Sequence, residues 1–200
     1  MQRRQPLGFT VVELMITLAV LAILVALAVP SFRDLMDKSR LRGATDDIVN
    51  LLNVSRINAV KLGKQVNVSV DASNWCAGAV DADKAGTNTP GNPIPVVAAC
   101  DCTASTVACT VGGQNALVKS SSYSGVTVTS DSANIILTNK GGITFNPKFG
   151  SLSLDTLANL SSVTVKSPTQ KYSTQITVSP LGQVYACSVG GKFISGYPSC

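Results

Sequence analysis

The chain has 200 residues, of which 45% are hydrophobic, and a net charge of +5. This length fits one domain together with a membrane anchor. The absence of histidine excludes Ser-His-Asp and Cys-His catalytic sites. The cysteines lack the paired spacing of a zinc site, and no glycine-rich phosphate loop follows a predicted strand. We therefore expect neither an enzyme nor a resident metal or cofactor.

A long apolar stretch near the amino terminus predicts a membrane-spanning helix. From Leu14 to Val29 the only polar residue is Thr17, and the run extended back to Phe9 approaches the ~20 residues that cross a bilayer. The leader before it, residues 1–8, contains Arg3 and Arg4 and no acid. Because positive flanks stay in the cytoplasm, everything after the apolar run is predicted to be exported.

Three interpretations of this stretch compete. A secretory signal peptide would be cut after the apolar run, where Ala26-Leu27-Ala28 offers small residues on either side of leucine. An ordinary signal anchor would not be cut. Neither accounts for Glu13, because a carboxylate in lipid costs at least ~2.5 kcal/mol and usually has an assigned partner. The third interpretation is a prepilin signal, which is cut before the apolar run.

The residues around Glu13 resemble the amino terminus of a type IV prepilin. Gly8 is followed by Phe9, Glu13 is the fifth residue after that bond, and the apolar run ends at Pro30. The resemblance implies that a prepilin peptidase cleaves between Gly8 and Phe9 and that the new terminal residue, Phe9, is N-methylated. It also implies that Glu13 meets the terminal amine of a neighbouring subunit during assembly. The helix of residues 9–30 would then serve first as an anchor and afterwards in the filament core.

Residues 31–63 are predicted to continue as an amphipathic helix that stops at Gly63. One face repeats at three- and four-residue spacing, through Leu41, Ala44, Ile48, Leu51, Leu52, Ser55, Ala59 and Leu62. The charged residues of this stretch are interpreted mainly as a solvated face, and contacts with neighbouring subunits are the alternative. They include Arg33, Asp37, Arg40 and Asp47.

Residues 64–200 are predicted to form an antiparallel β domain, because short β-branched runs alternate with Gly, Pro, Asn and Ser. The predicted strands are 65–70, 94–99, 107–118, 125–129, 134–138, 142–146, 163–166, 173–179 and 183–187. Residues 71–93 are interpreted as a turn-rich segment. In it, Asp81 and Asp83 lack the pattern of a calcium loop and are expected in an exposed loop. The predicted fold class is α+β, with the long helix packed on an antiparallel sheet.

The six cysteines follow residue 75, in the part of the chain predicted to be exported. Because disulfides persist outside the cytoplasm, we expect three bridges. Cys187 is predicted to pair with Cys200 across a glycine-containing loop. Cys76 is expected to pair with one of Cys100, Cys102 and Cys109, and the other two with each other. A Cys100–Cys102 bridge is the least favoured, since so short a ring is strained.

Two further stretches, 143–150 and 176–187, resemble the end of FimT/FimU minor pilins and the related GspH pseudopilins. The first ends with Phe-Asn-Pro-Lys-Phe-Gly, residues 145–150, where those proteins have a Phe-x-x-x-Gly turn, and the second holds a Gly-x-Val strand that starts at Gly182. With the amino-terminal part, the resemblance covers residues 1–70 and 143–187. DNA-binding FimT proteins carry arginines in a Gly-Arg-x-Arg pattern near this end. Here Gln183 and Tyr185 take those places, so DNA is not expected as a partner.

The resemblance implies a minor pilin of a type IV pilus that helps to initiate assembly or forms the tip, in support of twitching motility and adhesion. The alternatives are a DNA-binding minor pilin for natural transformation and a GspH-like pseudopilin of type II secretion. The implied partners are other pilins, the prepilin peptidase and the inner membrane. The implied location is a single-pass inner-membrane protein with a periplasmic domain, and a pilus filament or tip after assembly.

Overall fold

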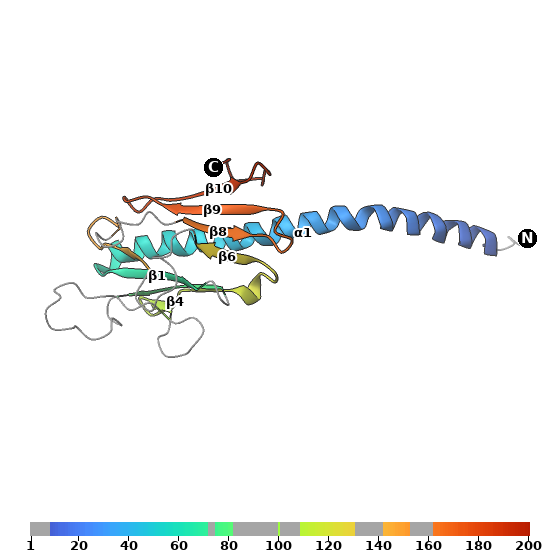
Figure 1. The fold of residues 1–200 in the computed structure, drawn as a ribbon. Helices are drawn as coiled ribbons and strands as arrows, with labels where there is room; N and C mark the ends of the chain where they lie inside the picture. The colour runs from blue at the N-terminus through green and yellow to red at the C-terminus, as the bar shows by residue number, and fades with distance from the viewer. Residues whose placement is uncertain (1–8, 72–74, 82–99, 101–108, 131–141, 153–161) are drawn as a thin grey trace, which may run out of the picture. The chain divides into compact units, whose positions relative to one another are not determined.

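The computed structural model describes residues 9–71, 75–81, 100, 109–130, 142–152 and 162–200. Its first element is a helix of 52 residues, α1 (Val11–Leu62), and short β-strands follow (Figure 1). The chain divides into two compact units, Met1–Met36 and Asp37–Cys200, so α1 contributes to both.

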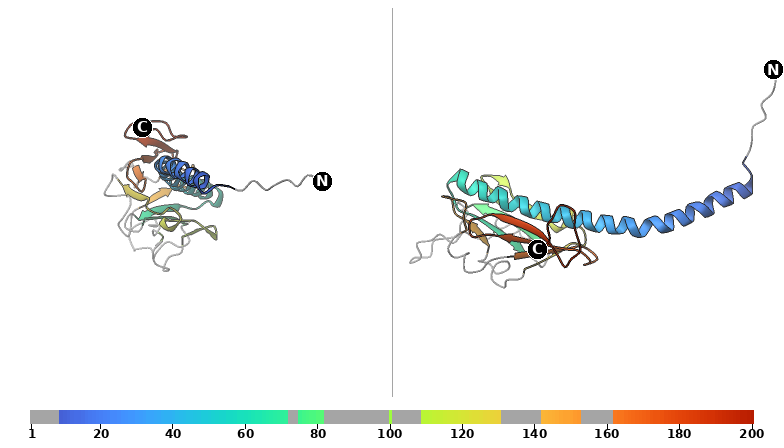
Figure 2. Two further views of the ribbon diagram at one scale, coloured as in Figure 1. Left: turned by 90° about the vertical axis from the view of Figure 1, so that its right-hand side faces the viewer. Right: turned by 90° about the horizontal axis from the view of Figure 1, so that it is seen from above.

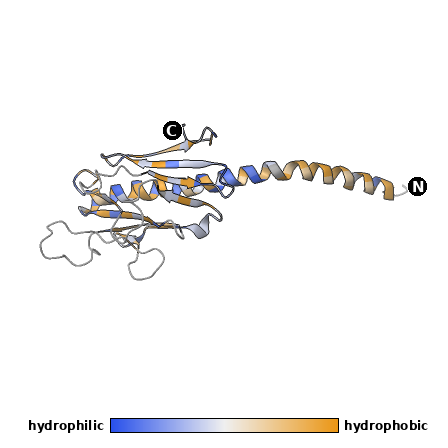
Figure 3. Cartoon of the chain, viewed as in Figure 1, coloured by the Kyte–Doolittle hydropathy of each residue, from blue (hydrophilic) through white to orange (hydrophobic). Residues whose placement is uncertain are grey.

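The part of α1 in the first unit is strongly apolar, as the orange ribbon of Figure 3 shows. Its sequence is rich in Leu, Ala, Val and Ile and has neither glycine nor proline from Val11 to Val29, so no residue interrupts the helical hydrogen bonds. Large side chains lie exposed along it, from Val11 at 75% to Val29 at 42%. This helix is long and apolar enough to cross a membrane.

The part of α1 in the second unit buries one face. Seven of the eight predicted face residues are buried, namely Leu41, Ala44, Ile48, Leu51, Leu52, Ser55 and Ala59, whereas Leu62 is 37% exposed. Each of the larger side chains contributes about 1.5–3 kcal/mol by burial. Gly63 has a φ of 65°, the left-handed conformation that commonly ends a helix. The predicted amphipathic helix and its end are therefore confirmed.

The first sheet has four antiparallel strands in the order β5 (Leu117–Lys119), β2 (Cys76–Asp81), β1 (Val66–Asp71) and β7 (Ile143–Phe145). Strand β1 is the predicted strand, and its valines at 66, 68 and 70 are buried. The predicted run 107–118 is divided into β3 (Thr110–Val111), β4 (Gln114–Asn115) and the start of β5. The division falls at Gly112 and Gly113, whose positive φ values form a turn.

Strand β2 corrects the prediction that residues 71–93 are only turns. It pairs with β1 along all six residues, from Asp71 opposite Cys76 to Val66 opposite Asp81. The sequence Cys-Ala-Gly-Ala-Val-Asp has few β-branched residues, so its preference for a strand is weak. Gly78 is required because a Cβ there would meet the sulfurs of Cys100 and Cys109. Asp81 is also not exposed, since it is 7% accessible and accepts the Gly112 N–H at 2.8 Å.

The second sheet is also antiparallel, in the order β10 (Val184–Val189), β9 (Ser173–Val178), β8 (Ser162–Lys166) and β6 (Thr127–Ser130). Strand β9 alternates between half-buried and buried residues, as expected for a sheet with one face on a core. A short 3₁₀ helix, η2 (Ser120–Ser122), precedes β6. The predicted strands 94–99 and 134–138 lie outside the described residues.

Both four-stranded sheets pack on the second part of α1 around one hydrophobic core (Figures 1 and 2). The largest fully buried side chains come from all three layers: Leu41 and Ile48 from α1, Phe145 from the first sheet, and Ile176 from the second. The carboxyl-terminal segment adds Ile194. The predicted α+β class, a long helix packed on antiparallel β structure, is confirmed.

Candidate functional site

The predicted processing segment lies immediately before α1. Gly8 is outside the described residues, whereas Phe9 is described and is 81% exposed. The helix begins at Val11, and the hydroxyl of Thr10 accepts the backbone N–H of Glu13 at 3.2 Å. Thr10 therefore acts as the N-cap of α1, satisfying one of the amides that a helix start leaves without a partner.

Glu13 occupies the third helical position, where acidic side chains are favoured by the positive end of the helix dipole. Thr10 and Glu13 also match the Thr-x-x-Glu pattern of a capping box. The pattern followed by an apolar run is a recognised helix-start signal, and the sequence interpretation passed over it. Glu13 is the only acidic residue before Asp34. Glu13 is also the fifth residue after the predicted cleavage bond.

Arg56 ties two turns to the second part of α1. Its Nε donates to the carbonyl of Gly150 at 3.1 Å, and its Nη2 donates to the carbonyl of Leu181 at 3.2 Å. These carbonyls belong to the two stretches that carry the resemblance to minor pilins. A single guanidinium suits this task, since it holds several N–H donors in one fixed plane.

The two turns also touch each other through their backbones. Gly150 and Gly182 have φ values of 62° and 76°, which favour glycine. A Cβ on Gly182 would collide with the carbonyl oxygen of Gly150, and a Cβ on Gly150 would approach the Arg56 side chain to 2.8 Å. Phe149 and Leu181 beside them are 78% and 68% exposed. The glycines of the two motifs thus allow close packing, and their apolar neighbours face solvent.

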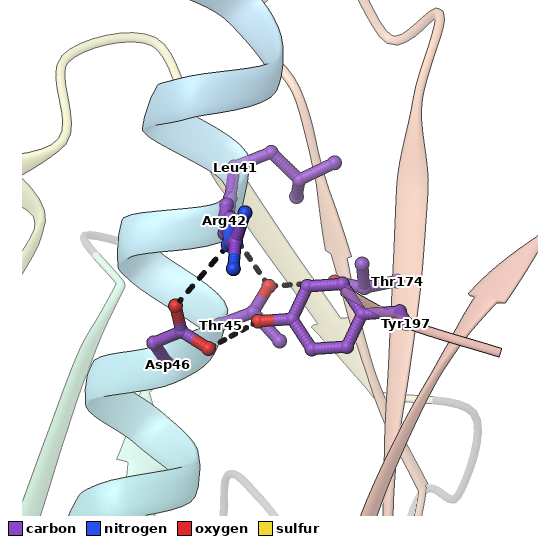
Figure 4. A network of polar contacts seen from close by, with 6 residues as sticks. All are labelled: Leu41, Arg42, Thr45, Asp46, Thr174 and Tyr197. Atoms are coloured by element: carbon purple, nitrogen blue, oxygen red, sulfur yellow. Dashed lines mark hydrogen bonds and ion pairs between the residues drawn. The ribbon is translucent and has the colours of Figure 1, made fainter. Parts of the chain in front are cut away.

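The carboxyl-terminal loop is attached to α1 through Asp46 (Figure 4). The hydroxyl of Tyr197 donates to Oδ1 of Asp46 at 2.5 Å, and Nε of Arg42 lies 3.7 Å from Oδ2. Burial, followed by the hydrogen bond to Asp46, raises the pKa of Tyr197. The adjacent residue Thr45 donates to the Leu41 carbonyl, one turn earlier in α1, at 2.8 Å. The Thr174 hydroxyl must therefore be the donor in its 2.7 Å contact with Thr45.

Asp47, the next residue of α1, is the attachment point for a different segment. The hydroxyl of Tyr123 donates to its Oδ2 at 2.5 Å. Burial, followed by this hydrogen bond, raises the pKa of Tyr123 to about 12. The Tyr123 ring stacks on Trp75 with centroids 6.1 Å apart. Adjacent aspartates thus bind tyrosines from two separate loops.

These contacts revise the expected solvated face of the helix. Asp37 is only 9% exposed and accepts a hydrogen bond from the Thr169 hydroxyl. Arg40 donates to the Ser124 carbonyl at 3.4 Å. The prediction failed for Asp37, because the loop that approaches it comes from a distant part of the sequence, whereas Asp47 and Arg40 are exposed as predicted. Arg33, in the first unit, is exposed.

Two disulfides join described cysteines. Cys187 and Cys200 are bonded with their Cα atoms 5.0 Å apart, and this is the pair that the sequence analysis predicted. Cys100 is bonded to Cys109, also with a Cα separation of 5.0 Å. Cys76 is disulfide-bonded as well. Cys102, the remaining cysteine of the sequence, lies outside the described residues.

Helix α1 begins beside a predicted processing site, is apolar in its first part and is buried in an antiparallel β domain in its second part. This arrangement defines a pilin-like protein. Two family models match the chain. The model described as type II transport protein GspH matches residues 44–182, and the model of the prokaryotic N-terminal methylation motif matches residues 3–29. The first match covers more than half of the chain, which therefore belongs to the GspH family.

A comparison with curated proteins finds no match. Among solved structures, the minor pseudopilin EpsH from the type 2 secretion system of Vibrio cholerae is similar to this chain. The TM-score is 0.46 and the sequence identity 10%, over 74% of this chain and 95% of that chain. The FimT/FimU subfamily remains a proposal.

Proposed function

We propose that the chain is a minor pilin of a type IV pilus, a filament subunit that helps to initiate assembly or forms the tip and supports twitching motility and adhesion. The observation that carries the proposal is the continuity of α1. Its first part exposes large apolar side chains, and its second part is buried in the β domain. One helix can therefore serve as a membrane anchor and then pack against the helices of other subunits. This is the role of a structural subunit rather than of an enzyme.

The amino-terminal residues support a specific order of events. A prepilin peptidase cleaves between Gly8 and Phe9, and the amine of Phe9 is methylated. Because Thr10 caps α1 through the Glu13 N–H, the new amine and the Glu13 carboxylate both lie at the helix start. In the filament, Glu13 pairs with the terminal amine of a neighbouring subunit, since an uncompensated carboxylate in apolar surroundings is costly. Before assembly the chain is anchored in the inner membrane with its β domain in the periplasm.

Two features support the minor-pilin assignment over a generic subunit. The stretches that resemble FimT/FimU proteins, 143–150 and 176–187, come together at Arg56 through two hydrogen bonds. Their glycines have the positive φ values that the resemblance implies for turns.

The second candidate is a pseudopilin of a type II secretion system, and the description of the matching family model favours it.

The DNA-binding alternative has no comparable support. Tyr185 and Gln183 occupy the positions of the family's arginines, and the Tyr185 hydroxyl donates to Gln183 Oε1 at 2.5 Å. These two side chains bond to each other and supply no positive charge for phosphate.

Gene deletion in the organism that encodes the chain tests the proposal. Loss of surface filaments and twitching with normal protein secretion would support the minor pilin. Loss of secretion with normal twitching would support the pseudopilin, and no change in either would contradict both. Complementation with Glu13→Ala and Glu13→Gln should fail equally, because both variants lack the charge that pairs with the amine. Rescue by Glu13→Gln would show that shape or hydrogen bonding, and not charge, is required.

A further inference from the structure

Four large apolar side chains lie exposed where two turns meet the end of α1. Ile57 and Val60 of α1 are 62% and 47% exposed. Phe149 and Leu181, in the two turns that Arg56 holds, are 78% and 68% exposed. Single exposed apolar residues are ordinary, whereas a contiguous group of them marks a contact surface. We call these four residues the turn surface.

The turn surface is hollowed. A hollow of about 480 Å³ is lined by Arg56, Ile57, Val60, Lys61 and Phe149. The four lining residues of α1 follow one another at i, i+1, i+4 and i+5, so they share one face of the helix. A hollow with apolar walls can receive a protruding side chain of a partner, and such contacts carry most of the binding free energy at protein interfaces.

The turns beside the hollow are fixed by backbone contacts. The Gly150 N–H donates to the Asn146 carbonyl at 2.9 Å, and the Gly182 N–H donates to the Ser179 carbonyl at 2.8 Å. Gly182 also packs so closely on Gly150 that no Cβ fits between them, and Arg56 holds both turns from α1. The surface is therefore formed before a partner arrives, which lowers the entropy that binding must overcome.

The charged side chains at the turn surface are all positive. Lys61 lines the hollow, Lys148 lies in the first turn, and both are exposed. Arg56 adds a third positive charge, and no ion pair joins any of the three to a described acidic residue. Acidic residues are absent from the segments that build the surface, which are 48–64, 143–150 and 176–187. The surface therefore attracts a partner with carboxylates and repels a basic one.

We propose that the turn surface docks an amphipathic helix of another subunit, with apolar side chains that enter the hollow and Asp or Glu residues that face Lys61 and Lys148. The inference rests on the proposed function for the statement that the partner is a subunit of the same assembly. A helix fits because its side-chain ridges can lie along α1, as in other helix-in-groove contacts. A bilayer fits less well, because apolar groups that enter lipid protrude, whereas this surface is concave.

The test places the full chain in phosphatidylcholine nanodiscs and measures binding of a fluorescein-labelled synthetic helix by anisotropy. This helix has a leucine face bordered by glutamates, and the matched helix has lysine in place of every glutamate. Empty nanodiscs give the lipid background. The glutamate helix should bind about tenfold more tightly than the lysine helix, because only the former meets opposite charge.

Substitutions locate the contact. Phe149→Ser and Ile57→Ser should each weaken binding of the glutamate helix about tenfold, since each removes an apolar wall of the hollow. Phe193→Ser is the matched control, because Phe193 is 70% exposed in the carboxyl-terminal loop and lies outside the turn surface. Lys61→Glu should weaken the glutamate helix and strengthen the lysine helix, whereas Lys192→Glu should change neither.

Equal binding of the two helices, or binding that survives Phe149→Ser, would overturn the proposal. Two other occupants would also overturn it if they bind and the glutamate helix does not. These are a second copy of the chain in separate nanodiscs and vesicles that contain phosphatidylglycerol, with binding in either case lost on Phe149→Ser.

Complementation of the gene deletion separates this contact from the proposed function. If the deletion impairs twitching and Phe149→Ser restores it fully, the docking surface is wrong and the subunit role stands. If the deletion impairs neither twitching nor secretion while the glutamate helix still binds, the subunit role is wrong and the surface stands.

Discussion

The Tyr197 hydroxyl donates a 2.5 Å hydrogen bond to Asp46, a residue 151 positions earlier in the sequence. Arg42 stands beside the other carboxylate oxygen at 3.7 Å, so both oxygens of Asp46 have a partner. Tyr197 is 8% exposed, and Ile194 in the same loop is 2% exposed. The carboxyl-terminal loop is therefore attached to α1 by the Tyr197–Asp46 hydrogen bond and contributes Ile194 to the folded core.

Removal of this hydroxyl should destabilise the domain. We expect Tyr197→Phe to lower the free energy of unfolding by about 1–2 kcal/mol. This loss is small for a hydrogen bond to a charged acceptor, because the Asp46 side chain is 60% exposed. Urea unfolding of the full chain in detergent micelles measures the loss. Tyr185→Phe is the matched control, since it removes a surface hydrogen bond to Gln183; equal losses in the two variants would contradict the assigned role of Tyr197.

Alkaline pH should weaken both tyrosine attachments. Burial and a hydrogen bond to Asp47 raise the pKa of Tyr123 to about 12, and burial and a hydrogen bond to Asp46 raise the pKa of Tyr197. The folded state therefore holds these protons more tightly than the unfolded chain. Their stabilisation is fully present below the ordinary tyrosine pKa of about 10 and is lost as pH rises through the folded-state values. Between about pH 9 and 11, wild type should lose more stability than Tyr123→Phe/Tyr197→Phe; equal losses would contradict this linkage.

The contact between the two turns at Arg56 predicts a large difference between two glycine substitutions. Gly182→Ala should cost about 1 kcal/mol for its positive φ and about 1–3 kcal/mol more for the collision with Gly150. Gly190→Ala provides the control, since Gly190 has a φ of 81° and nothing within 4 Å of the added Cβ. If the unfolding free energy of both variants depends on urea concentration with the same slope, the difference between their urea midpoints measures the cost of the collision alone. Indistinguishable midpoints would show that the turns can separate at little cost.

Local periodicity explains how much of this fold the sequence predicts. The spacing from Leu41 to Ala59 identified the buried face of α1, and alternation over 173–178 identified β9, because both signals depend only on neighbouring residues. The apolar run likewise indicated the spanning helix. Thr10 had a local signal that was overlooked, the Thr-x-x-Glu pattern before an apolar run.

The remaining contacts had no such signal. Strand β2 is composed largely of small residues, and its pairing with β1 supplies the order that its own sequence does not encode. Arg56 reaches carbonyls 94 and 125 residues away, and Asp47 reaches a tyrosine 76 residues away. The spacing of charged residues along a helix does not reveal which of them meets a distant loop.

The disulfide pattern can be determined by peptide mapping without reduction. We expect one linked pair containing Cys187 and Cys200 and another containing Cys100 and Cys109. Cys76, which is also bonded, should be linked to Cys102, the cysteine left over. Replacement of Cys187 and Cys200 by serine should lower the free energy of unfolding by about 3 kcal/mol, because the unfolded chain loses a loop constraint. Free thiols at Cys187 and Cys200 in exported protein would refute this pattern.

Processing of the amino terminus provides the last prediction. Gly8→Arg should block cleavage, because a bulky charged side chain replaces the residue with the least steric restriction beside the bond. Glu13→Ala should be cleaved normally, since Glu13 lies beyond the bond and its charge acts in assembly. Intact-mass measurement distinguishes the two, and the wild-type chain should begin at methylated Phe9. A wild-type chain that begins near Pro30 would show removal of the apolar run by a signal peptidase, and the prepilin interpretation would then be wrong.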